Sequence, residues 1–156
     1  MSIQLRSRAA NRSREAARFI VDNSVWARLS NSQQVRAAFV DLVNLHSPAS
    51  IMVCPPVVAE AGFSARTGAA HTRVTHELTA FPDCPKTPSS TDVLELQDRL
   101  WNGGLPRSVG AIETVIAAYA IRDDATAFHY ERDFEHVASV APGFRPAWVV
   151  PRGTIV

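Results

Sequence analysis

Five acidic residues stand out because each is isolated among small or apolar neighbours or closely follows an apolar run: Asp22, Glu60, Glu113, Glu131 and Asp133. Carboxylates are hard oxygen donors, the ligands that Mg²⁺ and Mn²⁺ prefer, and these ions bind through a few carboxylates while keeping several waters. A metal held in this way orients and activates water and neutralises charge on a phosphate group. The five acids therefore predict metal-assisted phosphodiester hydrolysis, provided that the fold brings them together.

Glu113 lies on an apolar helical face. It is the only charged residue between Val109 and Ile121, and Ile116 and Ala117 follow it at helical spacing. Burying an unpaired carboxylate costs far more than the roughly 0.3 to 1 kcal/mol that a helix N-terminus returns, so a buried Glu113 needs a metal ion or a cationic partner. One alternative stays open, because a first-turn glutamate can also turn outward to water.

Asp22 and Asp133 also have ordinary structural interpretations. An aspartate before a helix caps it by accepting hydrogen bonds from free backbone N–H groups, and both residues precede expected helices. Glu60, taken alone, is equally ambiguous. The functional interpretation depends on how the acids are placed together. Asp22 follows the first expected strand, and Glu60 lies on the helix after the second. Glu113 lies at the start of the helix before the fourth strand, and Glu131 and Asp133 follow that strand.

Short apolar runs alternate with helical patterns along the chain. Strands are expected at 18–22, 51–54, 81–84, 126–129 and 147–150, and helices at 23–29, 32–45, 55–66, 69–80, 90–101, 110–121 and 133–138. This alternation predicts an α/β domain with a mostly parallel sheet and helices on both faces. Such sheets place their functional sites at the carboxyl ends of the strands, where the acids are expected.

Composition excludes several other classes. At 156 residues the chain fits one domain, and it has no apolar run long enough to span a membrane and no secretion signal. Cys54 and Cys84 lie far apart without a CxxC pair, which argues against a disulfide framework, a zinc ribbon or an iron–sulfur site and favours inert thiols in a reducing cytoplasm. The five histidines show no HExxH spacing.

The start of the chain differs from the rest. The first 18 residues carry five arginines against one glutamate, whereas the remainder is net acidic. We expect residues 1–17 to form a flexible Arg-rich extension and residues 18–156 to form the single folded domain. Composition leaves three interpretations of the extension: an arm for nucleic acid or an acidic partner, a segment that resembles a transit peptide, or an addition without a role.

Four motifs resemble those of PIN-domain ribonucleases of the VapC toxin type. They are Phe-Ile-Val-Asp-Asn-Ser-Val-Trp-Ala-Arg-Leu at 19–29, Cys-Pro-Pro-Val-Val-Ala-Glu at 54–60, Glu-Thr-Val-Ile-Ala-Ala at 113–118 and His-Tyr-Glu-Arg-Asp-Phe at 129–134. The closing Trp-Val-Val-Pro-Arg-Gly at 148–153 is similar as well. The resemblance covers about residues 18–153, with the motifs in the right order and spacing.

The resemblance implies a PIN-like three-layer α/β/α sandwich with a five-stranded parallel sheet in the order 3-2-1-4-5. It also implies an endoribonuclease that is the toxin component of a toxin–antitoxin pair. Such a protein would act on RNA in the cytoplasm, form a homodimer without a membrane partner and be neutralised by a small cognate antitoxin protein.

The resemblance also assigns roles to residues. Asp22 and Glu113 would be the ligands of Mg²⁺, with Mn²⁺ able to replace it. Three further acids would complete the catalytic pocket and position water: Glu60, Glu131 and Asp133. Three polar residues at its edge would position the substrate: Asn23, Ser24 and Arg28. Further arginines that lie near the motifs and could contact phosphates are Arg66, Arg107 and Arg132.

Two departures from the family pattern leave alternatives open. Glutamates at 113 and 131 stand where the family usually has aspartates, and Mg²⁺ tolerates misplaced oxygens poorly, so activity could be reduced. Asp133 could then replace Glu131. The first alternative is a catalytically weakened PIN-fold protein that binds RNA or an antitoxin. A phosphatase of the haloacid-dehalogenase type would need a second aspartate two residues after Asp22, where this chain has Ser24.

Overall fold

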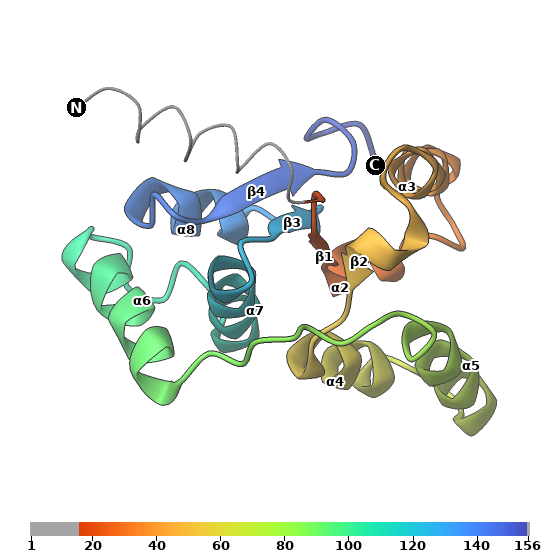
Figure 1. The fold of residues 1–156 in the computed structure, drawn as a ribbon, viewed down its shortest axis with the longest axis horizontal. Helices are drawn as coiled ribbons and strands as arrows, with labels where there is room; N and C mark the ends of the chain where they lie inside the picture. Colours follow the sequence, from red (N-terminus) through yellow and green to blue (C-terminus); the bar gives the residue numbers. More distant parts are fainter. Residues whose placement is uncertain (1–15, 156) are drawn as a thin grey trace.

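The computed structural model describes residues 16–155. In this part of the chain four parallel strands form one sheet, in the order β2-β1-β3-β4 (Figure 1). Their bounds are β1 Phe19–Val21, β2 Ile51–Met52, β3 Thr126–His129 and β4 Arg145–Trp148. The central strand β1 pairs with β2 on one side and with β3 on the other. The expected Arg-rich extension falls mostly on residues 1–15, which lie outside the described residues.

Each expected helix is present, with ends that shift by a few residues. Their bounds are α2 Asn23–Trp26, α3 Gln33–His46, α4 Pro55–Phe63, α5 Gly68–Leu78, α6 Ser90–Asn102, α7 Ala111–Arg122 and α8 Asp133–Val140, with a short 3₁₀ turn η1 at Pro48–Ser50. Hydroxyl caps begin several of them, and Ser89 with Asp92 forms a capping box at α6. Across residues 16–155, no helix combines the length and apolar character needed to cross a membrane.

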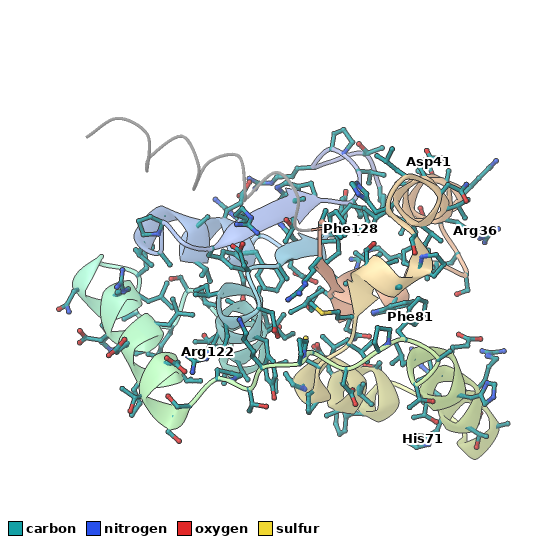
Figure 2. The ribbon with its side chains drawn as sticks, in the orientation of Figure 1. Arg36, Asp41, His71, Phe81, Arg122 and Phe128 are labelled. Carbon is teal, nitrogen blue, oxygen red and sulfur yellow. The ribbon has the colours of Figure 1, made fainter. Side chains whose placement is uncertain are left out.

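Helices cover both faces of the sheet because neighbouring strand residues point to opposite sides. Ile20 belongs to a core shared with α4, α6, α7 and α8, whereas Val21 belongs to a second core shared with α2, α3 and the C-terminal segment. Phe128 lies in the second core, and Phe81, beside β2 in Figure 2, packs on Trp26 with ring centroids 5.3 Å apart. The result is a three-layer α/β/α sandwich.

The expected fifth strand is wrong. Residues 81–84 contribute a single bridge, between Val53 and Asp83, and the order 3-2-1-4-5 is replaced by the four-stranded order above. Pro82 and Pro85 explain this difference, because proline has no N–H to donate to a sheet. The final strand also begins and ends earlier than the expected 147–150.

The two cysteines lie on neighbouring segments at this bridge. The Cys84 N–H donates to the carbonyl of Val53, 2.9 Å away, one residue before Cys54. Within the described chain both are free thiols, and Cys54 is buried. A hydrogen bond with the Cys54 thiol, together with burial, raises the pKa of Cys84. Both effects disfavour the reactive thiolate, consistent with the expected inert pair.

Candidate active site

Asp22 is placed at the carboxyl end of β1 by two hydrogen bonds. Its N–H donates to the carbonyl of Phe128 on β3, 2.9 Å away, and its Oδ2 accepts the Ser24 N–H at 2.8 Å, which caps α2. The side chain is 2% exposed, and its Oδ1 has no hydrogen-bond partner among residues 16–155. Burial raises the pKa of Asp22. Capping therefore satisfies one carboxylate oxygen and leaves the other without a donor.

Glu60 on α4 shares this edge of the sheet with the other acids. Burial raises the pKa of Glu60 to about 7, together with the negative charges of three other carboxylates: Asp22, Glu113 and Glu131. Like charges shift one another's pKa in this way only when they lie near each other. The structure therefore brings together four acids that come from four separate segments of the sequence.

Glu113 folds back over the start of α7. A Cβ atom built on Gly110 would lie 2.0 Å from Oε2 of Glu113, so the carboxylate occupies the space that a side chain at 110 would need. Burial raises the pKa of Glu113, its own backbone N–H lowers it, and the charges of Asp22 and Asp133 raise it. Glu113 is half-buried, between the fully buried and the water-exposed positions considered from the sequence.

Glu131 and Asp133 lie on the turn after β3. The Glu131 N–H donates to Nδ1 of His129 at 3.1 Å, and burial raises the pKa of its side chain. Asp133 is the first residue of α8, and its Oδ2 accepts the Gly110 N–H at 3.1 Å. Asp133 thereby ties the start of α8 to the start of α7, which carries Glu113.

The residues expected to position substrate differ in their contacts. The Ser24 Oγ accepts the Tyr130 N–H at 2.9 Å, so Ser24 joins α2 to the turn after β3. The Arg28 guanidinium donates to the carbonyl of Ser24 at 2.7 Å and lies 5.1 Å from the centroid of the Tyr130 ring. Its positive charge lowers the pKa of both Asp22 and Glu131. Asn23 lines the groove between α2, α4 and α5.

His129 is buried behind the acids and is not placed as a ligand. Its ring lies 4.9 Å from those of Phe134 and Trp148, and its Nε2 has no hydrogen-bond partner within the described part of the chain. Burial lowers the pKa of His129 to about 4, so the ring is neutral at neutral pH. It packs in the core.

The side chains that could bind an ion at this site are carboxylates, the ligands that hard divalent cations prefer. Within residues 16–155, no three histidine, cysteine, aspartate or glutamate side chains lie close enough together to hold an ion jointly. Mg²⁺ commonly binds through only one or two carboxylates and keeps its other waters. The unpartnered Oδ1 of Asp22 is a buried anionic oxygen beside further carboxylates, so a cation would relieve both its desolvation and the mutual repulsion.

Two residues of the site were not identified from the sequence. Gly110 provides the space that the Glu113 carboxylate occupies, and Tyr130 provides the ring on which Arg28 rests. A glycine three positions before an isolated helical acid is a signal that could have been noted for Gly110. Nothing in the local sequence pairs Tyr130 with Arg28, because they are neighbours only through the β1–β3 pairing.

The fold and the site define a parallel α/β sandwich with buried and half-buried acids at the carboxyl ends of its strands. In sequence, the chain is 29% identical over 140 residues to Ribonuclease VapC18 of Mycobacterium tuberculosis, a match that covers 88% of this chain and 98% of that protein. No protein-family model matches the chain.

Solved structures share the fold. A DNA-bound VapBC from Salmonella typhimurium matches with a TM-score of 0.64 and 18% identity over 86% of this chain and 99% of that one. VapBC-5 from Mycobacterium tuberculosis, a member of the VapBC family of toxin–antitoxin systems, matches with a TM-score of 0.60 and 17% identity over the same shares of the two chains. With the sequence match, these findings confirm the resemblance to PIN-domain ribonucleases of the VapC type.

Proposed function

We propose that this chain is a Mg²⁺-dependent endoribonuclease, with Mn²⁺ as an alternative ion, and the toxin component of a toxin–antitoxin pair. The observation that carries the proposal is Asp22, which is 2% exposed and keeps Oδ1 without a partner among residues 16–155 at a strand end shared with three glutamates. The similarity to a protein named as a ribonuclease supports RNA as the substrate.

The acids divide into different roles. Asp22 and Glu113 would hold the ion, which when bound supplies activation of water and neutralisation of charge on the phosphate. Glu60 and Glu131 line the same edge, where their carboxylates can accept hydrogen bonds from the attacking water and orient it. Asp133 already accepts the Gly110 N–H, so we assign it a positioning role for the start of α7.

Substrate binding needs positive charge beside these acids, because RNA is an anion. Arg28 provides it, since its guanidinium is fixed by the Ser24 carbonyl and the Tyr130 ring and acts electrostatically on Asp22 and Glu131. Guanidinium groups bind phosphate oxygens in a planar, bidentate manner. We therefore assign Arg28 to a phosphate next to the scissile one.

The direct test is cleavage of a structured RNA pool by purified protein in Mg²⁺, Mn²⁺ or EDTA. Asp22→Asn is the matched control, because an asparagine oxygen can still accept the Ser24 N–H and cap α2. We expect metal-dependent cleavage by the wild type and none by the variant. If neither protein cleaves any of the RNAs with any of the ions, the proposed nuclease function is contradicted.

One observation favours a second candidate, a weakened PIN-fold protein that binds RNA or an antitoxin. Glu113 turns back over Gly110, and its extra methylene relative to aspartate changes where its oxygens can reach. RNA binding without cleavage, unchanged by Asp22→Asn, would support this candidate over the nuclease.

The proposed partners are a small antitoxin and a second copy of the chain. Two fold neighbours are VapBC assemblies, and one is described as part of a toxin–antitoxin system. We expect expression of the wild type to arrest bacterial growth and co-expression of the small protein encoded beside it to restore growth. Asp22→Asn should be harmless by itself. Analytical ultracentrifugation of that variant tests the dimer.

A further inference from the structure

Phe63 is an aromatic side chain left in water at the rim of the acidic site. It is the last residue of α4 and is 91% exposed, more than the other large hydrophobic residues exposed in residues 16–155. It follows Glu60 by three positions, and residues at that spacing on a helix are neighbours, with Cβ atoms about 5–6 Å apart. The ring therefore lies beside Glu60, whose pKa is raised in part by the charges of three other acids of the site.

Phe63 does not belong to the groove on the other side of α4. That groove lies between α2, α4 and α5 and is lined from the α4 segment by Ala61, Ser64 and Ala65. Trp26 also lines it, but the Trp26 indole N–H donates to the Val21 carbonyl at 2.8 Å and its ring packs on Phe39 and Phe81. Trp26 is therefore held by the protein core, whereas the ring of Phe63 is free to receive a ligand.

The site has different chemistry at its two ends. The Arg28 guanidinium is fixed by the Ser24 carbonyl, 2.7 Å away, and by the ring of Tyr130, whereas Phe63 ends α4. Tyr130 directly precedes Glu131, and Phe63 lies three positions after Glu60. A strand of RNA that crosses Asp22 thus meets a phosphate-binding cation on the Glu131 side and an aromatic ring on the Glu60 side. Proteins that bind single strands combine these two elements, because phosphates need cations and unpaired bases stack on aromatic rings.

We propose that Phe63 is a substrate-binding residue that stacks on an unpaired RNA base adjacent to the scissile phosphate. This inference rests on the proposed ribonuclease function and adds to it a residue that contacts the substrate outside the acidic site. Stacking tolerates any base, since every base has a π-face. Phe63 therefore selects an unpaired nucleotide at this position and does not read its identity.

The test compares Phe63 variants on a short unpaired RNA containing a mapped cleavage site. Phe63→Ala should raise KM about tenfold with little change in kcat, because base stacking on an aromatic ring contributes roughly that much to binding. Phe63→Tyr should restore KM, and Phe63→Leu, which keeps apolar bulk without a ring, should not. Leu45→Ala is the matched control, because Leu45 is 78% exposed near the end of α3, at the opposite end of the sheet.

A substrate change sharpens the test. Removing the base next to the cleaved bond should weaken wild-type binding as much as Phe63→Ala does, and the two changes together should add nothing further. Fluorescence anisotropy in an Asp22→Asn background measures this coupling without cleavage. Fully additive effects would overturn the inference.

The two proposals fail in different ways. Unchanged KM in Phe63→Ala, with cleavage still abolished by Asp22→Asn, would overturn the stacking role and leave the nuclease intact. Loss of antitoxin affinity in Phe63→Ala with unchanged RNA binding would also overturn it and assign the ring to a protein partner. A wild type that cleaves no RNA but binds it through Phe63 would contradict the nuclease alone.

Discussion

Two buried aspartates lie at opposite ends of the parallel sheet. Asp22 follows β1 at the carboxyl end, and Asp123 caps the end of α7 just before β3, at the amino end. They are 2% and 1% exposed, and each has at least one carboxylate oxygen without a hydrogen-bond partner among residues 16–155. Burial alone does not distinguish them, so the difference must come from their surroundings.

The balance of charge around the two aspartates differs. Asp22 shares its end of the sheet with glutamates that raise one another's pKa. Asp123 lines a cavity of about 610 Å³ together with three basic residues and one further acid: Arg18, Lys86, Arg145 and Asp124. Basic residues therefore outnumber acids at the amino end, whereas at the carboxyl end Arg28 lies beside several acids. This contrast separates a structural carboxylate from one suited to binding a metal ion.

The largest expected effect separates the two aspartates by activity. Asp22→Asn should lower the rate of RNA cleavage by more than about 100-fold, because it removes the charge of a proposed metal ligand. Asp123→Asn should leave the rate within about twofold. Initial rates in Mg²⁺ measure both, with circular dichroism to verify the fold, and a comparable loss in the two variants would remove the distinction.

Metal binding should raise the free energy of unfolding only when the proposed site at the carboxyl end of the sheet is intact. A ligand at 100 times its Kd adds about 2.7 kcal/mol to the free energy of unfolding, which corresponds to a Tm increase of several degrees for a domain of this size. We expect Mg²⁺ to raise the Tm of the wild type and of Asp123→Asn, but not that of Asp22→Asn. Differential scanning calorimetry measures the shift, and the same increase in all three proteins would place the bound ion elsewhere.

A smaller effect is expected in the pH dependence of stability without metal. The pKa of Glu60 is raised to about 7 in the folded protein from an ordinary 4.5. Between these values the folded state holds a proton that the unfolded state releases, so this group makes the free energy of unfolding fall as pH rises from 4.5 to 7.

Urea unfolding in EDTA across that pH range measures the effect. Glu60→Gln should flatten this part of the profile, whereas Glu77→Gln, at an exposed position on α5, should leave the profile unchanged. An identical profile in Glu60→Gln would show that neither burial nor the neighbouring acids raise the pKa of Glu60 in the folded protein.

The smallest effect is expected at the amino end. Arg145 and Asp124 form an ion pair of 2.6 Å, and their side chains are 51% and 72% exposed. Because exposed ion pairs contribute little, Arg145→Ala should cost at most about 1 kcal/mol of unfolding free energy, measured by urea denaturation, with unchanged cleavage. A clearly larger loss would mean that Asp123 depends on Arg145 as its counter-charge.

Local sequence signals predicted most of the fold because each acts over a few residues. The helix start expected at 90, the prolines at the start of α4 and the isolated apolar runs all correspond to observed helix starts and strands. The segment 81–84 was expected as a short edge strand broken by prolines, and it makes only a single bridge, because the prolines remove too many donors for a strand to form. Only contacts with β2 decide whether such a segment pairs.

The candidate site was predictable in its members but not in their arrangement. The apolar run before Asp22 and the apolar helical face around Glu113 made these residues candidates, but they did not show that Glu113 folds over Gly110 or that Asp133 bonds to the Gly110 N–H. Those contacts depend on side-chain rotamers and on the approach of α7 to α8, which join residues far apart in sequence. Asp123 was not noticed, because Asp123-Asp124 has the sequence of an ordinary turn.

The missing side chain at Gly110 determines how far Glu113 can extend. A glutamate has one methylene more than the aspartate common in VapC-type proteins, and here that extra length is accommodated by folding back over a residue that has no Cβ. An alanine at 110 would displace the carboxylate, and because only the end of a flexible side chain must move, the helix could remain intact. The two positions are thus coupled sterically, and we expect related sequences to exchange residues 110 and 113 together, as a covarying pair.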